Sequence, residues 1–294
     1  MESKVQLALG VAARPAPVSA VTLPDFTERP HEDFPWQSTW LLIGQPKNGK
    51  SKLAEHLSRA ALEKFGKPLL HLDTENGAHQ IHGAKIHVLN LGELDRLIQA
   101  LEVGGHEKYS GFILDTTDML SEWCDRLTCL ELKIGGIGQA EYGKDYVVSR
   151  NHFMSRMMRL KTLGKALILI AHTKTEKRDD VSQTRPNLTG QLSEMVMGQS
   201  DSIAYLALEK VKGSKPKRGS DEDGVPDTYK RILSFAGHEG LCAGSRYEAL
   251  NGQRFELQDL TKWPEGNLWL PVFDAFKIQE EAEQTDKEGK SGLL

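Results

Sequence analysis

One segment of the sequence has the residue types and the spacing needed to bind the phosphates of a nucleotide. The run GQPKNGKS fits the pattern G-x-x-x-x-G-K-[ST], with Gly49, Lys50 and Ser51 at its end. Its glycines let successive backbone N–H groups point at phosphate oxygens, and a following helix adds its positive N-terminal end. Lys50 is expected to reach the β- and γ-phosphates, and the Ser51 hydroxyl to bind Mg²⁺. The sequence therefore predicts ATP and Mg²⁺ as cofactors, with the nucleotide held by Gly44, Gln45, Pro46, Lys47, Asn48, Gly49, Lys50, Ser51 and Lys52.

Two further apolar runs are followed by acidic residues. Phe112–Leu114 precedes Asp115, which is expected to hold Mg²⁺, mostly through water, at the carboxyl end of a strand. Leu69–Leu72 precedes Asp73 and Glu75. A carboxylate at Glu75 would orient and deprotonate the water that attacks the γ-phosphate, and the alternative is a solvated turn acid. Asp73 would assist Mg²⁺ or cap the turn.

The most apolar run of the chain, Ala166–Ala171, ends at His172. Ligands of open α/β sheets bind at the carboxyl ends of the strands, so this histidine is a candidate sensor of the γ-phosphate. A lone histidine is otherwise more often structural, and that alternative stays open.

The surrounding pattern indicates the elements that position these residues. Runs of strand length alternate with helical spacing, which is typical of a parallel sheet covered by helices on both faces. Two later runs, Ser202–Leu208 and Tyr229–Phe235, flank the polar insertion Glu209–Thr228 and indicate an antiparallel extension of the α/β core. Strands are expected at Trp40–Ile43, Leu69–Leu72, Ile86–Leu91, Phe112–Leu114 and Ala166–Ala171, and helices at Ser51–Phe65, Leu94–Leu101, Met119–Leu132 and Asp145–Leu163.

Composition places the chain among globular proteins of a reducing compartment. The 294 residues are 39% hydrophobic and 27% charged, enough for one large α/β domain. The 3 cysteines form no CxxC pair, so we expect a cytoplasmic location. No apolar stretch approaches the ~20 residues of a membrane span, and no membrane contact is expected. The net charge of -4 requires any nucleic-acid contact to come from a local basic patch.

Three sections are expected along the chain. Residues 1–36 contain repeated prolines without sustained periodicity and are interpreted as a flexible N-terminal tail. Residues 37–276 form the ATPase domain with its β extension. Residues 277–294 are charged and poor in apolar side chains, so they are interpreted as a disordered C-terminal tail.

The order of the motifs resembles the RecA-like ATPases, which include RecA recombinases and DnaB-type helicases. A phosphate loop comes first, then Asp73-Thr74-Glu75 after one strand, Asp115 after the next, and the polar His172 after a third. The resemblance spans about Trp40 to Arg246. In style and length it is closest to the phage-encoded, Sak-type single-strand annealing ATPases. It implies a RecA-like core, ATP hydrolysis, a ring or filament of identical subunits, and a location in the host cytoplasm.

The resemblance also implies two segments that bind single-stranded DNA. One is the glycine-rich Ile134–Tyr146, and the other is Lys174–Thr189. The second segment holds nearly as many acids as bases, and the aromatic residues are limited to Tyr142 and Tyr146, so charge attraction and base stacking are modest. A solvated loop is the alternative for each. Candidate DNA contacts are Lys144, Lys174, Lys177, Arg178 and Arg185, together with Lys210 and Lys212. The last two belong to the basic cluster Lys210–Arg218. The alternatives for this cluster are contact with the nucleotide of a neighbouring subunit and a solvated hairpin tip.

RecA-like motors borrow a cation from the next subunit to neutralise γ-phosphate charge. DnaB-type proteins use a Lys-x-Arg pair for this, and the present chain has Gly244-Ser245-Arg246 at the similar place. The arginine is kept and the lysine is absent, which weighs against helicase-like turnover. Arg246 is the first candidate for the borrowed cation and Arg231 the second.

The function indicated is ATP-dependent binding of single-stranded DNA in recombination, annealing or replication, with hydrolysis stimulated by DNA. The alternatives are a helicase or translocase motor and a nucleotide-switched assembly adaptor with little turnover. A small-molecule kinase would need an Arg-rich lid, and Lys210–Arg218 is mostly lysine. The catalytic residues expected are Glu75, Lys50, His172 and Arg246, and the metal ligands are Ser51 and Asp115.

Overall fold

The computed structural model describes residues 36–163, 165–178, 180–211, 228–257, 268–269 and 271–277. All of them belong to the compact unit Glu32–Leu294. The tails predicted at residues 1–36 and 277–294 lie almost wholly outside the described residues, as does most of the polar insertion between residues 212 and 227.

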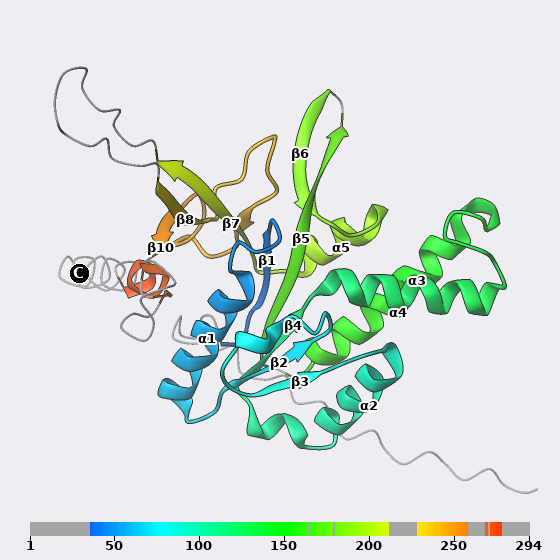
Figure 1. The fold of residues 1–294 in the computed structure, drawn as a ribbon, viewed down its shortest axis with the longest axis horizontal. Coiled ribbons are helices and arrows are strands. Elements are labelled where there is room, and N and C mark those ends of the chain that lie inside the picture. The colour runs from blue at the N-terminus through cyan, green and yellow to red at the C-terminus, as the bar shows by residue number, and fades with distance from the viewer. Residues whose placement is uncertain are drawn as a thin grey trace, which may run out of the picture. The chain divides into compact units, whose positions relative to one another are not determined.

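A ten-stranded sheet forms the centre of the described structure (Figure 1). Its order is β10-β8-β7-β1-β5-β4-β2-β3, and the strands from β7 to β3 run parallel. β8 and β10 continue the sheet antiparallel, while β6 pairs with β5 and β9 with β7. The strands are β1 (Thr39–Gly44), β2 (Leu69–Asp73), β3 (Lys85–His87), β4 (Gly111–Asp115), β5 (Ala166–Arg178), β6 (Val181–Pro186), β7 (Ser202–Val211), β8 (Thr228–Ser234), β9 (Gly244–Ser245) and β10 (Arg254–Leu257).

Helices cover both faces of this sheet because its strands are apolar on both sides. Successive residues of β1 point to opposite faces, so Trp40 and Leu42 join the core beneath α1, whereas Leu41 and Ile43 join the core beneath α2 to α5. None of the described helices is long and apolar enough to cross a membrane. The helices are α1 (Lys50–Phe65), α2 (Leu91–Glu102), α3 (Thr117–Leu132), α4 (Lys144–Lys161) and α5 (Gly190–Gln199), with short 3-10 turns η2 (Ala78–Gln80), η3 (Gly105–Lys108) and η4 (Glu141–Gly143).

The predicted fold class, a RecA-like α/β core with an antiparallel extension, is confirmed by this arrangement. Two local expectations were wrong. The run Ile86–Leu91 contributes only the short β3, because Leu91 already begins α2. The segment Lys174–Thr189 is not an irregular loop, since β5 continues to Arg178 and pairs with β6 in a hairpin that projects from the sheet (Figure 1).

Residues near the C-terminus close the core on the α1 side. Trp269 is 1% exposed, packs edge-to-face on Trp40, and donates a 2.8 Å hydrogen bond from Nε1 to Leu53 O of α1. Leu268 N donates to His56 Nδ1 over 3.3 Å. Burial, with Lys52 and Arg59 nearby, lowers the pKa of His56 to about 3. The helix that follows the phosphate loop is therefore fixed partly by a neutral histidine.

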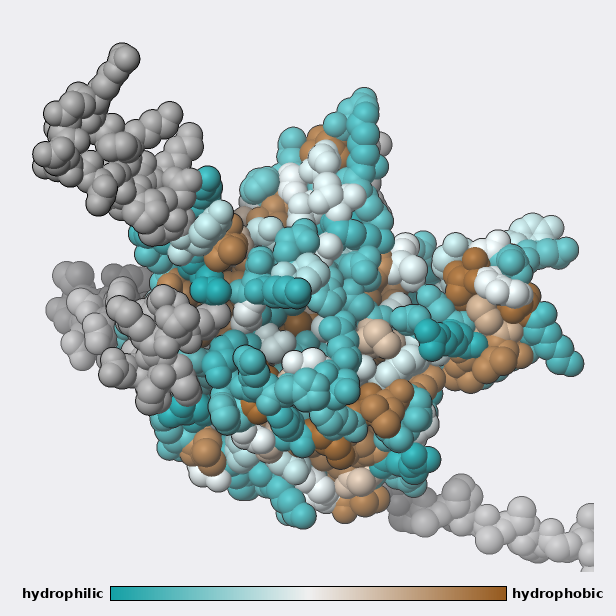
Figure 2. Space-filling view, viewed as in Figure 1, coloured by the Kyte–Doolittle hydropathy of each residue, from teal (hydrophilic) through white to brown (hydrophobic). Residues whose placement is uncertain are grey.

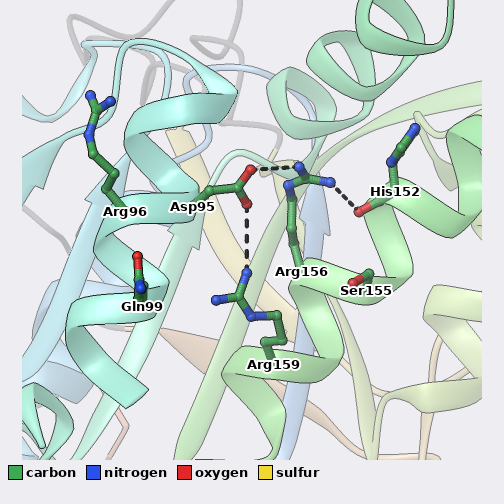
Figure 3. Close-up of a pocket in the computed structure, with 7 residues that line it drawn as sticks. All are labelled: Asp95, Arg96, Gln99, His152, Ser155, Arg156 and Arg159. Atoms are coloured by element: carbon green, nitrogen blue, oxygen red, sulfur yellow. Dashed lines mark hydrogen bonds and ion pairs between the residues drawn. The ribbon is translucent and has the colours of Figure 1, made fainter. Parts of the chain in front are cut away.

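A network of ion pairs holds α2 against α4 on the molecular surface (Figure 3). Arg156 Nη2 lies 2.7 Å from Asp95 Oδ2, and Arg159 Nη1 lies 3.8 Å from Asp95 Oδ1. Arg159 also donates hydrogen bonds of 2.8 and 2.7 Å to Glu102, and these bonds lower the pKa of Glu102. The cavity of about 450 Å³ among these side chains is thus bordered by Arg156 and Arg159, whose guanidinium groups are already paired with acids.

Candidate nucleotide-binding site

The register of the parallel strands brings the predicted polar residues to one edge of the sheet. Gly44 at the end of β1 lies opposite His172 of β5, and Asp73 at the end of β2 lies opposite Asp115 of β4. This edge is formed by the carboxyl ends of the strands, where ligands of open α/β sheets bind. The four residues therefore surround the loop that joins β1 to α1.

The conformation of this loop explains its glycines. A Cβ at Gly44 would lie 2.7 Å from the Leu206 carbonyl oxygen of β7, so a side chain there would push β1 and β7 apart. Gly49 has φ 98°, a left-handed backbone that favours glycine, and α1 begins at the next residue. The loop consequently turns directly into the positive N-terminus of α1.

Lys50 is the first residue of α1, and its side chain turns back to the start of the loop. Its side chain is buried, and Nζ donates hydrogen bonds of 2.9 Å to the carbonyl oxygens of Gly44 and Gln45. Burial lowers the pKa of Lys50, and three nearby carboxylates oppose that shift. A buried cation held by neutral carbonyls has donors suited to a phosphate. The three carboxylates are Asp115, Asp118 and Glu75.

The donors available for Mg²⁺ are Ser51 and Asp115. Both line the same cavity as Lys50, and Asp115 is 7% exposed, with Oδ2 held 3.0 Å from His71 Nε2. No group of three or more His, Cys, Asp or Glu suited to a metal occurs within the described part of the chain. The two oxygen donors Ser51 and Asp115 fit Mg²⁺, which is usually bound by one or two protein oxygens together with waters and substrate phosphates.

Glu75 and His172 lie beside each other in the lining of the cavity. Glu75 Oε1 accepts a 2.7 Å hydrogen bond from Thr116 Oγ1 and lies 3.7 Å from His172 Nδ1. The backbone N–H of His172 donates to Asp118 Oδ2 over 3.0 Å, which fixes the end of the apolar part of β5. Glu75 is thus oriented by the Thr116 hydroxyl, and its expected role in positioning water stays a prediction.

Asp73 caps the turn that carries Glu75. Its Oδ1 accepts from the N–H groups of Glu75 and Gly77, each over 3.2 Å, and its Oδ2 accepts from Ala78 N over 2.9 Å and lies 3.1 Å from His87 Nδ1. Of the two roles expected for Asp73, the structure shows turn capping.

One cavity of about 790 Å³ unites these groups. Sequence reasoning missed several of its residues: Thr116 follows Asp115 directly, and Gln80 and Ile81 come from the turn after β2. Asp118, in the first turn of α3, was also not predicted from the sequence as part of the site. Its position three residues after Asp115 could have indicated it. The lining residues are Pro46, Lys47, Gly49, Lys50, Ser51, Lys52, Asp73, Glu75, Gly77, Gln80, Ile81, Asp115, Thr116, His172 and Arg231.

The two arginines considered for a borrowed cation lie in different places. Arg231 of β8 lines the nucleotide cavity of its own chain. Arg246 does not, because Nη1 pairs with Asp201 Oδ1 at 2.9 Å and Asp201 precedes β7 at the opposite edge of the sheet. Arg246 is 61% exposed, so an action on a neighbouring subunit stays a prediction.

The two segments expected to bind DNA meet at a second cavity of about 550 Å³. Tyr142, Tyr146 and Arg150 line it from the first segment and α4, and Lys174 from β5. Tyr142 is fully exposed and Tyr146 is 47% exposed. Figure 2 shows hydrophobic side chains over the outer end of α3 and α4 and a mostly hydrophilic β5–β6 hairpin. Leu130, in the last turn of α3, is 77% exposed.

The remaining candidate DNA contacts are distributed unevenly. Arg185 is corrected: it is 2% exposed and lies 3.7 Å from Glu194, so it is part of the interior. Lys177 is exposed but pairs with Asp180 at 2.8 Å, and Lys144 and Lys210 are exposed. The Arg178 side chain, Lys212 and the rest of the basic cluster lie outside the described residues.

The chain is similar in part to known proteins. A solved structure of a KaiC-like protein from the hyperthermophilic archaeon Pyrococcus horikoshii OT3 is similar, with 14% identity, coverage of 76% of this chain and 87% of that chain, and a TM-score of 0.43. No curated protein matched the chain. Residues 37–247 match the family described as AAA domain, which is more than half of the sequence and contains the whole phosphate-binding loop. The chain therefore belongs to this family of AAA domains, nucleotide-binding P-loop ATPases.

Proposed function

We propose that the protein binds and hydrolyses ATP and uses this cycle to bind single-stranded DNA in recombination, annealing or replication. The observation that carries the ATPase part is the single cavity in which Lys50, Ser51, Asp115, Glu75 and His172 meet. Membership of the AAA domain family supports the same conclusion.

In this proposal each residue has a separate task. Lys50 and the loop N–H groups would bind the β- and γ-phosphates, and Ser51 and Asp115 would hold Mg²⁺, which would neutralise phosphate charge. Glu75 takes the proton of the attacking water, and Thr116 keeps its carboxylate in place through the 2.7 Å hydrogen bond. His172, 3.7 Å from Glu75, senses the γ-phosphate.

Strand β5 supports the coupling to DNA. It carries His172 in the nucleotide cavity and Lys174 in the second cavity. Residues two apart on a strand lie on the same face, so a movement of His172 is transmitted to Lys174 over one pleat. The exposed Tyr142 offers a ring for base stacking next to Lys174 and Arg150.

The proposal includes assembly of identical subunits into a ring or filament and a role like that of the phage Sak-type annealing ATPases. Arg246 is the exposed arginine that a neighbouring site would use. A location in the host cytoplasm accompanies this proposal.

The test is fluorescence anisotropy of a labelled single-stranded oligonucleotide, with and without ATP, for the wild type and for Tyr142→Ala. We expect binding that ATP strengthens and that Tyr142→Ala weakens. Leu89→Ala, an exposed apolar residue on the α2 side, is the control and is expected to bind as the wild type. Strand displacement instead of annealing would favour the motor alternative, and absence of DNA binding would favour the nucleotide-switched adaptor.

A further inference from the structure

We infer that Arg231 binds a phosphate oxygen of the nucleotide held by its own chain, rather than that of a neighbouring subunit. This inference rests on the proposed binding of a nucleotide by the phosphate loop. It adds a residue of the antiparallel extension to that site. It also means that the arginine acts on the nucleotide of its own chain and not on that of the next subunit.

The placement of Arg231 follows from the strand register. Gly44, the last residue of β1, pairs with Leu206 of β7, so β7 runs on past the end of β1 beside the phosphate loop. Leu208, two residues further, pairs with Arg231 of β8. β7 and β8 therefore form a wall next to the loop, and Arg231 stands at the height of the loop on that wall.

Two hydrogen bonds attach the loop to this wall. Asn48 Nδ2 donates to Leu206 O over 3.1 Å, and Arg231 Nε donates to Asn48 O over 3.2 Å. The side chain of Asn48 is thus occupied with β7, so Asn48 holds the loop in position and its side chain is not directed at a phosphate. Arg231 in turn lies against the backbone of the loop whose N–H groups are to bind phosphate.

The charge of Arg231 has no acidic partner among the residues that the structure describes. Its neighbours on the same sheet edge do: Lys230 pairs with Glu256 at 2.8 Å, and Arg254 pairs with Glu209. Arg231 is only partly exposed, and a single carbonyl uses one of the five N–H donors of its guanidinium. A planar fork with free donors in a cavity that also contains Lys50 matches a phosphate group.

The first experiment measures ATP and ADP affinity by isothermal titration calorimetry for wild type, Arg231→Ala and Arg231→Lys. Loss of a charge-assisted hydrogen bond is expected to weaken ATP binding about 10-fold or more in the alanine variant, with a smaller loss in the lysine variant. A larger loss for ATP than for ADP assigns the contact to the γ-phosphate, and equal losses assign it to the phosphates that both nucleotides share. Lys230→Ala, the adjacent residue on the other face of β8, is the matched control and is expected to bind as the wild type.

Two further measurements distinguish failure of this inference from failure of nucleotide binding and from misfolding. Lys50→Ala tests nucleotide binding itself, so its loss of affinity upholds the proposed function whatever Arg231 does. Melting curves without nucleotide show whether Arg231→Ala folds, and if it does not, Arg231→Lys decides. ATP affinity unchanged in the folded variant would overturn the inference and leave Arg231 as a purely structural link to Asn48.

A mixture of Lys50→Ala and Arg231→Ala subunits distinguishes an arginine that acts within its own chain from one that acts on a neighbouring subunit. Lys50→Ala subunits retain Arg231, and Arg231→Ala subunits retain the phosphate loop. If Arg231 acts within its own chain, the mixture hydrolyses ATP no faster than the two variants measured separately. Recovery of hydrolysis on mixing would show that the arginine acts between subunits and would overturn the inference.

Discussion

The nucleotide cavity and the second cavity, near Tyr142, differ in how their basic side chains are bound. In the first, Lys50 donates to carbonyl oxygens of its own loop. In the second, Lys174 lies 2.5 Å from Glu176, and Arg150 donates to the Gln191 side chain. At Lys50 a ligand phosphate has only to displace neutral carbonyls, whereas at Lys174 it competes with a carboxylate. The nucleotide cavity is accordingly marked by a specific motif in the sequence. The second cavity is marked only by a segment in which acids nearly balance the bases.

The largest effect is expected from Lys50→Ala. It removes the buried ammonium that faces the phosphates, and a loss of about 10²–10³-fold in hydrolysis is expected, as for other groups that stabilise transition-state charge. A phosphate-release assay at saturating ATP measures it. Lys64→Ala on the exposed last turn of the same helix is the control and should leave the rate unchanged. Equal rates in Lys50→Ala and wild type would contradict the assignment of the loop.

Glu75→Gln separates binding from hydrolysis. The amide keeps the shape of the carboxylate but cannot accept the proton of water, so hydrolysis is expected to fall about 10²–10⁴-fold while ATP binding persists. Calorimetry and phosphate release on the same preparation measure both. Glu63→Gln, exposed on α1, serves as the control. A DNA-binding or assembly activity that is unchanged in Glu75→Gln would support the adaptor alternative.

The sequence predicted the nucleotide cavity well because its parts lie in order along the chain. A loop fixed by Gly44, Gly49 and Lys50 needs only a strand before it and a helix after it, and the acids at strand ends follow from parallel pairing. Arg231 reaches the cavity only because β8 pairs beside β7, a contact between distant segments that no local pattern encodes. Arg185 was misassigned because a basic residue in a polar run gives no local sign that its side chain is 2% exposed.

A smaller effect is expected at the second cavity. Lys174→Ala should weaken binding of single-stranded DNA only a few-fold, because Glu176 already offsets much of this charge. If Lys174 contacts one phosphate, the slope of log K against log salt should decrease by about 0.7. Anisotropy titrations at several salt concentrations measure this slope. Glu176→Ala sharpens the comparison, since removing the competing carboxylate should strengthen DNA binding. An unchanged slope in both variants would remove Lys174 from the DNA surface.

The smallest effect concerns pH and the support of α1 behind the nucleotide cavity. The pKa of His56 is about 3 in the folded chain and about 6.5 in the unfolded chain, so the unfolded state binds more protons between these values. Stability from the neutral ring is complete above pH 6.5 and is lost progressively as the pH falls towards 3. Thermal unfolding from pH 7 to pH 5 should show a steeper decline for wild type than for His56→Asn, which keeps an acceptor for Leu268 N but does not titrate. Parallel declines would contradict this role of His56.

We propose that nucleotide hydrolysis in the first cavity is coupled to DNA at the second cavity through β5. The most direct measurement is the rate of ATP hydrolysis by the full chain with and without single-stranded DNA, alongside Lys50→Ala. We expect a severalfold increase with DNA in the wild type and a rate about 10²–10³-fold lower in the variant. Hydrolysis that depends on Lys50 but is indifferent to DNA would contradict the coupling, and would leave an AAA domain ATPase that acts on another partner.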